Sequence, residues 1–510
     1  MSAAFVGLEM ILFFKKYHKW LGIVLSIFVI LFSVSGIILN HRELFSAIDL
    51  SRKVMPAEYR YKNWNNSAVK GTVKSDDNNI LIYGNIGIWK TDTAFSEFDD
   101  FNAGFPKGID NRKICKLFND AHGNLFAGTF FGLYKYDIIK ELWQKIELPV
   151  HNQRITDIIE KDNNLLVITR SHLLQTEDCK KFKVLTLPAP ENFDNKISLF
   201  KTLWVIHSGE IYGEIGKLLV DLVGLIFIFL TITGLIYFIN TYKIKNRLEE
   251  KKDFASLKKT NKWNLKWHNK IGWITIILLI ITTLTGVFLR PPLLIAIANS
   301  KVDKIPYTEL DSPNPWFDKL RRIYYDKEID RYIIATLDGF YYSDDNFKSE
   351  LRKYKTQPPA SVMGVNVLQK VGSNKYLVGS FEGLFEWQPA SGNIIDHITK
   401  EKYIKPEIKG PPIGEYLVTG MSKDFRNNEI YFTYNKGAIS KNEKIGFAEM
   451  PEEIQRQPIS LWNIALEVHT ARIYAFFVGN FYFLIIPLAG LLILFILISG
   501  FIVWYKLHQR

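Results

Sequence analysis

Histidines stand at matching places in two apolar stretches of the chain, and histidine is the commonest metal-binding side chain. His18 and His268 each begin a His-x-x-x-Gly motif that runs into an apolar segment. In both segments a hydroxyl residue followed by glycine begins 17 positions after the histidine, at Ser35-Gly36 and Thr285-Gly286. Histidine is rare in membrane helices because its polar ring needs a partner there. Two histidines at one register of two repeated helices can therefore hold an iron between them.

A second pair of histidines, His207 and His469, begins the pattern His-x-small-x-Ile-Tyr-small. An apolar segment follows each of them and ends at Thr233-Gly234 or Ser499-Gly500. The second copy has four additional residues between the histidine and the glycine pair, which leaves open whether the two rings lie level. The shared patterns indicate a tandem duplication in which the order helix, outer segment, helix occurs twice.

Four apolar runs must position these histidines. They lie near residues 20–40, 216–240, 271–289 and 473–505. Each run is long enough to cross a hydrocarbon core of about 30 Å. Successive spans alternate in direction, so His18 and His268 are expected at one membrane face and the other two histidines at the opposite face. Gly479-Asn480 and Pro487 interrupt the last run, where a kink or an outer extension is expected.

Each histidine pair suits a haem iron. A neutral imidazole on both sides of the iron gives an electron-transfer centre without an open coordination position. We therefore predict two b-type haems, each held by two histidines, with irons about 15–20 Å apart across a core of about 30 Å. No Cys-x-x-Cys-His occurs, so covalent attachment is not indicated.

Further residues are candidates for the haem sites. The glycines of the four hydroxyl–glycine pairs would leave a gap for a flat macrocycle. These glycines are Gly36, Gly234, Gly286 and Gly500. Close packing of the helices explains them equally well. Arg290 and Arg472 would neutralise haem propionates or serve as interfacial anchors. His41 is a fifth candidate ligand at the outer level, in place of His207 or His469.

Positive charge predicts the orientation in the membrane. The net charge is +12, and lysine and arginine gather before the first run, between the second and third, and after the fourth. By the positive-inside rule both termini and the loop 241–266 are cytoplasmic, and segments 41–205 and 291–465 lie outside. Nucleic-acid binding is not expected. Because no dinucleotide fingerprint occurs, a membrane quinol or another membrane redox protein is the expected donor.

The two outer segments repeat a hairpin pattern of apolar strand, glycine-centred turn and aromatic strand. Clear copies are Asn79–Gly84 with Gly87–Asp92, and Lys375–Ser380 with Gly383–Trp387. Three copies per segment at a period of about 40–50 residues are typical of propeller blades. The expected fold is four transmembrane helices from a tandem duplication, with an all-β domain of about six blades made from both segments. Two small β domains without ring closure are the alternative.

These patterns divide the chain into seven parts. In order, they are a first helix (1–48), a β segment (49–200), a second helix (201–242), a cytoplasmic loop (243–266), a third helix (267–292), a second β segment (293–460) and a last helix (461–510). Cys115 and Cys179 are the only cysteines, and their spacing establishes neither a disulfide nor a metal site.

The motifs at His18, His207, His268 and His469, in this order, resemble those of the PepSY-associated transmembrane family. The resemblance covers the four membrane segments. It implies a likeness to inner-membrane reductases of ferric siderophores, which carry two b-type haems on histidines of a four-helix core. It also implies a bacterial inner membrane, periplasmic β segments and electron transfer outward to a ferric complex. The β segments differ from PepSY domains.

The resulting hypothesis is a di-haem membrane protein that reduces an extracytoplasmic acceptor. The alternative is a haem-free, membrane-anchored propeller that binds a ligand or a partner. A zinc hydrolase is disfavoured because no carboxylate accompanies the histidines as a zinc site would need.

Overall fold

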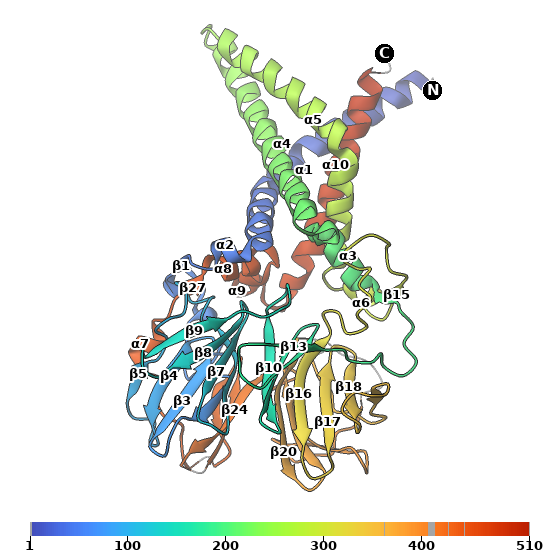
Figure 1. Cartoon of the computed structure of the whole chain (residues 1–510). Coiled ribbons are helices and arrows are strands. Elements are labelled where there is room, and N and C mark those ends of the chain that lie inside the picture. Colours follow the sequence, from blue (N-terminus) through green and yellow to red (C-terminus); the bar gives the residue numbers. More distant parts are fainter. Residues whose placement is uncertain (1–2, 362, 406–413, 427, 443, 509–510) are drawn as a thin grey trace. The chain divides into compact units, whose positions relative to one another are not determined.

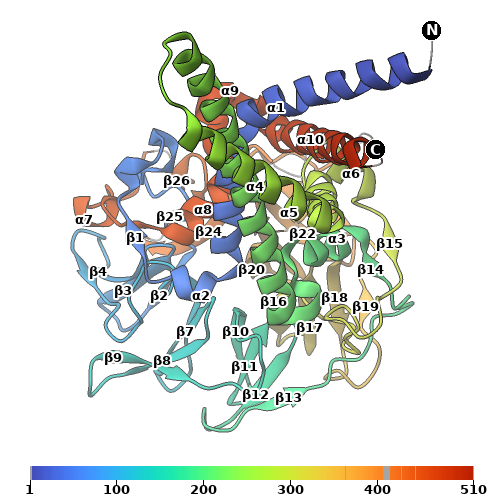
Figure 2. The same cartoon turned by 90° about the horizontal axis from the view of Figure 1, so that it is seen from above.

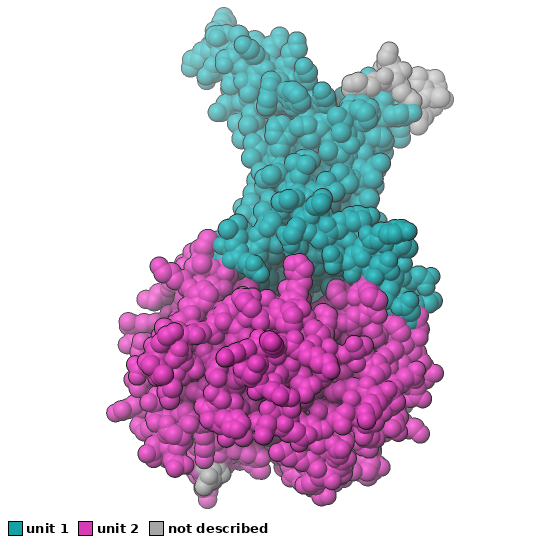
Figure 3. Space-filling model, viewed as in Figure 1, with its two compact units in different colours: residues 1–45, 195–311, 461–510 teal, residues 46–194, 312–460 magenta. Residues whose placement is uncertain are grey.

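The computed structural model describes residues 3–361, 363–405, 414–426, 428–442 and 444–508. The chain forms two compact units, which Figure 3 colours separately. Unit 1 contains residues 1–45, 195–311 and 461–510, and unit 2 contains residues 46–194 and 312–460. The first unit is helical and the second is built of β-sheets.

Unit 1 is organised around four long helices. They are α1 (Ala3–Asn40), α4 (Gly213–Glu249), α5 (Ala255–Phe288) and α10 (Ile485–His508). Each belongs to a segment that is long and apolar enough to cross a membrane, as expected from the sequence. Helices α1 and α5 both pack against α4 and α10, so that α1 and α5 lie on one diagonal of the bundle. The start of α1, the end of α10 and the α4–α5 connection lie at the same end of this bundle (Figure 1).

Two short helices precede the second and fourth long helices. Helix α3 (Leu199–Ser208) packs against α5, and α8 (Leu461–His469) packs against α1. The chain turns sharply after each of them, through Gly209 with φ 81° and Ala471 with φ 59°. A β-carbon at Gly209 would lie 2.1 Å from the carbonyl oxygen of Gly216, so only glycine fits this turn.

The interruption expected in the fourth span is present. After α8 come the 3-10 helix η4 (Arg472–Tyr474), α9 (Ala475–Val478) and the 3-10 helix η5 (Gly479–Leu484), and only then α10. In the second span η3 (Glu210–Tyr212) leads directly into α4. The additional residues of the fourth span are therefore taken up by the turn rather than by a change in histidine depth.

The segment 243–266 is largely helical. Helix α4 continues to Glu249 and α5 begins at Ala255, which leaves a short connection in place of the longer loop expected. Lysine, glutamate and leucine are good helix formers, so the helices extend beyond their apolar parts.

Unit 2 contains six consecutive groups of antiparallel strands. The first three groups are β2 (Gly71–Lys74), β3 (Asn79–Gly84), β4 (Gly87–Asp92) and β5 (Phe98–Asp100); β6 (Ile114–Asn119), β7 (Leu125–Thr129), β8 (Leu133–Asp137) and β9 (Leu142–Ile146); and β10 (Ile155–Lys161), β11 (Asn164–Thr169), β12 (Leu173–Thr176) and β13 (Lys183–Leu185). The others are β16 (Leu320–Asp326), β17 (Arg331–Thr336), β18 (Gly339–Ser343) and β19 (Arg352–Lys353); β20 (Val365–Gly372), β21 (Lys375–Ser380), β22 (Gly383–Gln388) and β23 (Asn393–Asp396); and β24 (Val418–Phe425), β25 (Asn428–Thr433) and β26 (Gly437–Ser440). The hairpins expected from the sequence are present in all six groups.

The first strands of neighbouring groups contact one another in the order β2, β6, β10, β16, β20, β24 and back to β2. The contact between β24 and β2 is a parallel pairing that joins two groups into one seven-stranded sheet. Figure 2 shows the groups following one another around unit 2. Five buried tryptophans, Trp64, Trp89, Trp143, Trp316 and Trp387, fill the apolar cores between the groups.

Smaller elements complete both units. In unit 2, β1 (Asp49–Leu50) pairs with β27 (Ile459–Ser460), so the first and last segments of this unit are joined. In unit 1, β14 (Ile197–Ser198) pairs with β15 (Lys301–Val302). The remaining short helices are α2 (Arg42–Phe45), η1 (Arg52–Val54), η2 (Ala57–Tyr59), α6 (Leu293–Ile297) and α7 (Glu452–Gln455).

Candidate functional site: two histidine pairs in the helical unit

The first histidine pair joins helices on a diagonal of the bundle. His18 on α1 and His268 on α5 have ring centroids 6.2 Å apart, and their planes are nearly perpendicular at 86°. Both histidines lie in the halves of their helices nearer the α4–α5 connection. The pairing expected from their common register is therefore present.

The second pair joins the two short helices. His207 is the second-last residue of α3, and His469 is the last residue of α8. Their ring centroids are 6.1 Å apart, with an interplanar angle of 48°. The two rings are thus close together despite the longer spacing in the second copy, because α9 and η5 absorb the additional residues.

Every histidine of the two pairs directs Nδ1 to a neighbouring helix. All four rings have a backbone carbonyl as a neighbour: Nδ1 lies 2.9 Å from Ile496 in His18, 2.9 Å from Thr282 in His207 and 3.0 Å from Phe32 in His469, and His268 has a backbone hydrogen bond to Leu230. All four also lie near the hydroxyl of a residue that precedes glycine. These hydroxyl contacts are Ser499 with His18 at 3.3 Å, Thr285 with His207 at 3.4 Å, Thr233 with His268 at 3.0 Å and Ser35 with His469 at 3.0 Å.

These contacts determine which ring nitrogen carries the proton. Each hydroxyl donates its single hydrogen to a carbonyl of its own helix, as Ser35 does to Leu31 at 2.6 Å and Thr233 does to Phe229 at 2.8 Å. The hydroxyl oxygen can then only accept, as a backbone carbonyl does. We therefore assign the proton to Nδ1 in all four rings, which leaves an unprotonated Nε2. None of these Nε2 atoms has a hydrogen-bond partner in the described part of the chain.

The ring separations fit two imidazoles on one metal. A metal–imidazole bond is about 2.05 Å, taken from zinc. A ring nitrogen lies about 1.1 Å from the centroid of a five-membered ring with bonds of about 1.33 Å. Two collinear ligands would thus have centroids about 6.3 Å apart, against 6.2 and 6.1 Å here. Among the described residues no group of three or more His, Cys, Asp or Glu could hold a metal ion. If such a pair held a haem iron, the porphyrin would supply the four other ligands.

Each of the four glycines lies beside a histidine of another helix, as expected from the alternating directions of the spans. A β-carbon at Gly500 would lie 2.8 Å from Cε1 of His18, one at Gly286 2.7 Å from Cε1 of His207, and one at Gly36 3.2 Å from Cε1 of His469. At Gly234 the distance to Cε1 of His268 would be 3.6 Å. The glycines therefore provide space for the imidazole rings themselves. A gap for the macrocycle next to them remains a prediction.

His41 lies with other residues. Its Nε2 is 2.5 Å from Oδ2 of Asp221 on α4, and Asn40 donates to Oδ1 of the same carboxylate at 2.9 Å. The side chain of Asp221 is 11% exposed. An ionisable residue in an apolar helix needs such a partner. The structure thus gives His41 a structural partner and does not bring it into either ring pair.

Arg290 and Arg472 lie near the pair formed by His207 and His469, as expected. We call this pair the outer pair and that of His18 and His268 the inner pair. Arg472 pairs with Glu467 at 2.5 Å, and its Nε is buried without a hydrogen-bond partner among the described residues. Arg290 lies within electrostatic reach of Arg472 and His469. A buried, unpaired guanidinium nitrogen is a donor that a carboxylate would satisfy. This arrangement fits a propionate beside the outer pair.

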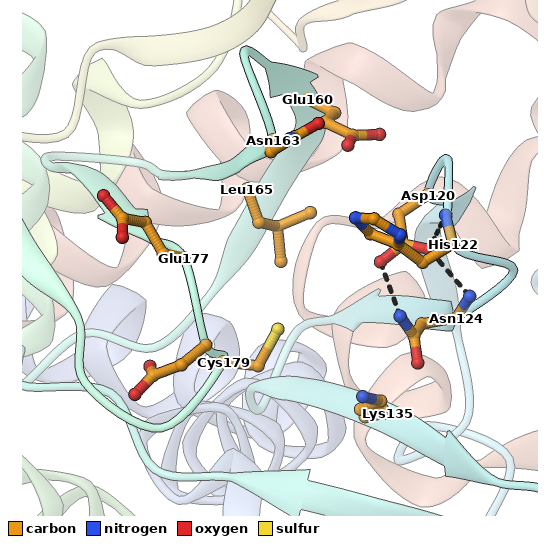
Figure 4. Close-up of a pocket in the computed structure, with 10 residues that line it drawn as sticks. Asp120, His122, Asn124, Lys135, Glu160, Asn163, Leu165, Glu177 and Cys179 are labelled. Carbon is orange, nitrogen blue, oxygen red and sulfur yellow. Dashed lines mark hydrogen bonds between the residues drawn. The ribbon is translucent and has the colours of Figure 1, made fainter.

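Unit 2 contains a pocket that the sequence did not predict. It is a cavity of about 160 Å³ whose lining includes Asp120, His122, Glu160 and Cys179 (Figure 4). Asp120 accepts hydrogen bonds from the backbone of His122 and Asn124, so it serves its own turn. Both cysteines are free. The pocket is therefore a weaker candidate than the histidine pairs.

The helices and their histidines define a four-span membrane protein with a large extramembrane β unit. A family model described as the PepSY-associated TM region matches residues 10–240 and again residues 186–507. The chain belongs to this family, as its motifs predicted. None of the curated proteins matches it.

Several solved structures have some similarity to the chain, at low sequence identity. The extracellular domain of a putative hybrid two-component system, BT4673 of B. thetaiotaomicron, has 12% identity and a TM-score of 0.35, over 73% of this chain and 32% of that one. The computationally designed protein Ika8 has 10% identity and a TM-score of 0.31, over 74% of this chain and 98% of that one. PorZ of Porphyromonas gingivalis has 9% identity and a TM-score of 0.32, over 72% and 38%. The chain spans about a third of the length of the BT4673 domain.

Proposed function

We propose that this protein is a di-haem b electron-transfer protein of the bacterial inner membrane. His18 and His268 would hold one haem, and His207 and His469 the other. The observation that carries this proposal is the state of the four rings: each Nδ1 is held by a neighbouring helix, each Nε2 is free, and the paired rings are 6.1–6.2 Å apart. Bound haem iron would supply reversible one-electron chemistry.

The chain's own residues would perform the remaining tasks. The carbonyls and hydroxyls at Nδ1 fix the tautomer and orientation of the ligands, and a hydrogen bond to this nitrogen raises the basicity of the imidazole. Arg290 and Arg472 would balance the propionate charge of the outer haem. The apolar helices exclude water from the path between the two sites.

We propose that electrons cross from the cytoplasmic side to a periplasmic acceptor, most simply a ferric siderophore complex. Each ferric ion takes one electron and becomes ferrous. The donor would be a membrane quinol or a membrane redox protein. The lysine-rich segment 241–266 supports a cytoplasmic location for both termini. Family membership and the likeness of the motifs to ferric-siderophore reductases support the substrate class.

We further propose that unit 2 is a six-bladed, propeller-like domain and that the chain arose by tandem duplication. The closed order of neighbouring strand groups supports the first point. The second is supported by the two overlapping family matches and by the repeated histidine–glycine contacts. In such a ring the only sheet edges are short strands at the outside of each blade.

Stopped-flow spectroscopy of the purified protein tests this function. The dithionite-reduced protein, freed of excess reductant, is mixed anaerobically with a ferric siderophore. We expect the reduced b-type band to disappear, and to persist with the gallium complex of the same siderophore, which matches the ferric complex in size but is not reduced. Persistence of the band with the ferric complex would contradict the proposed substrate.

The alternative is a haem-free, membrane-anchored β domain that binds a ligand or partner. The large β unit, with its closed strand order, supports this alternative because such a domain can bind a ligand or partner without haem. A colourless preparation with correct folding would support this alternative, because the histidine pairs would then serve only packing.

A further inference from the structure

Two buried asparagines lie on α5 just before His268. Asn264 is one helical turn away and 2% exposed, and Asn261 is about two turns away and 8% exposed. Among the described residues, Nδ2 of Asn264 and Oδ1 of Asn261 are buried without any hydrogen-bond partner. A buried polar group left unpaired costs about 1–3 kcal/mol. The two amides therefore need an explanation that the histidine pairs do not provide.

The amides face α4. Nδ2 of Asn261 lies 3.4 Å from the carbonyl oxygen of Tyr237 and 3.3 Å from the hydroxyl of Thr241, both on α4. Asn240, on the same helix, is 8% exposed. Polar side chains thus gather between α4 and α5, on the side of His268 nearer the α4–α5 connection.

The other half of the bundle provides a comparison within the same molecule. His18 precedes His268 by 250 positions, and the same offset relates Asn261 to Ile11 and Asn264 to Phe14. Ile11 is buried, and Phe14 packs against Phe495 with ring centroids 6.1 Å apart. The bundle therefore accepts apolar residues at these positions, and its packing does not require the asparagines.

We propose that Asn264 and Asn261 bind the headgroup of a membrane quinol. The free donor of Asn264 and the free acceptor of Asn261 lie three residues apart on one helix face, and a phenolic hydroxyl can accept from the first and donate to the second. A haem propionate, which can only accept, would leave Asn261 unsatisfied. This inference rests on the proposed function, since it gives the inner histidine pair an electron donor one helical turn away.

A binding titration of the full-length protein in detergent tests the proposal. The probe is the fluorescent quinol analogue 2-heptyl-4-hydroxyquinoline N-oxide, and the variants are Asn264→Leu and Asn261→Ile. We expect each to weaken binding about tenfold, which corresponds to the loss of about 1.4 kcal/mol. The control Phe14→Leu, at the matching position of the other half, should bind the probe as the wild type does.

The haem spectrum of each sample separates the two proposals. Weaker probe binding with an unchanged haem spectrum supports the quinol site. Wild-type binding of the probe by both asparagine variants would overturn it. Binding that depends on Asn264 in a protein without haem would support the quinol site but overturn the proposed function.

Discussion

A β-carbon at Gly286 would lie 2.7 Å from Cε1 of His207. Real β-carbons do not approach other atoms so closely, so α5 accommodates the imidazole only because this residue is glycine. At Gly234 the corresponding distance to His268 is 3.6 Å, which is an ordinary van der Waals contact. Both glycines follow a threonine and lie beside a histidine of another helix, yet only the first is sterically required.

This difference gives a prediction for alanine substitutions. Gly286→Ala should displace the ring of His207 and weaken haem binding at the outer site about 10–100-fold, the range typical for disturbed ligand support. Gly234→Ala should leave the inner site intact. Haem content per chain after dialysis measures both effects. Gly22→Ala is the control, because nothing lies within 4 Å of a β-carbon there. Equal haem content in the variants at 286 and 234 would contradict this interpretation of the glycines.

The hydroxyl contacts also differ between sites. The hydroxyl of Thr233 lies 3.0 Å from Nδ1 of His268, which also has a backbone hydrogen bond to Leu230. The hydroxyl of Thr285 lies farther from Nδ1 of His207, at 3.4 Å, and that nitrogen has the carbonyl of Thr282 at 2.9 Å. Loss of a hydrogen bond at Nδ1 lowers the basicity of the ligand, so it should raise the reduction potential of the haem. We expect Thr233→Val to raise the potential of one haem and Thr285→Val to change neither markedly. Spectroelectrochemical titration measures this, and a shift in Thr285→Val alone would reverse the assignment.

His41 should be dispensable for haem. Its partner is Asp221, so His41→Ala should retain both haems while lowering stability. Removing one partner of a buried hydrogen-bonded pair costs about 1–3 kcal/mol, and the 25% exposure of His41 places the loss toward the lower end. Thermal unfolding monitored beside the haem spectrum checks both parts. Loss of one haem in this variant would show that His41 is a ligand after all.

An ion-pair cluster in unit 2 should give acid sensitivity. His397 bridges two carboxylates, with Nδ1 at 2.6 Å from Glu386 and Nε2 at 3.3 Å from Glu429. Burial alone would raise the pKa of Glu386, but hydrogen bonds from Lys375 and His397 outweigh burial and lower the pKa from 4.5 to about 2. Because the folded pKa is depressed, the stabilisation is complete above about pH 4.5 and is lost as the pH falls toward 2.

Glu386→Gln should therefore be less stable than the wild type at pH 6 and should lose less stability between pH 4.5 and pH 2. Urea unfolding followed by tryptophan fluorescence gives the midpoint at each pH. Parallel curves for the two proteins would show that this carboxylate does not cause the acid sensitivity.

The sequence predicted those features that depend on local pattern. The hairpin at Asn79–Gly84 and Gly87–Asp92 was predictable because a continuous apolar run is followed by a glycine-centred turn and an aromatic strand, and the structure has strands with these bounds. The pairing of His18 with His268 followed from their common register in apolar segments. In these cases the neighbours in space follow from spacing along the chain.

Other features depend on contacts between distant residues. The carbonyl oxygens that hold Nδ1 belong to residues such as Phe32 and Ile496, whose side chains give no sign of this role. Asp221 is 180 positions from His41, so the sequence alone could not show that these two residues form a pair. The level of His469 relative to His207 depends on how the residues of α9 and η5 fold. The spacing along the chain did not determine this.

The most direct test of the account is the number of haems per chain. The pyridine haemochrome assay, combined with protein quantification, should give two b-type haems in the purified wild type. It should give one in each of the single variants His18→Ala, His268→Ala, His207→Ala and His469→Ala. Full haem content in all four variants, or a correctly folded wild type without haem, would contradict the assignment of the histidine pairs.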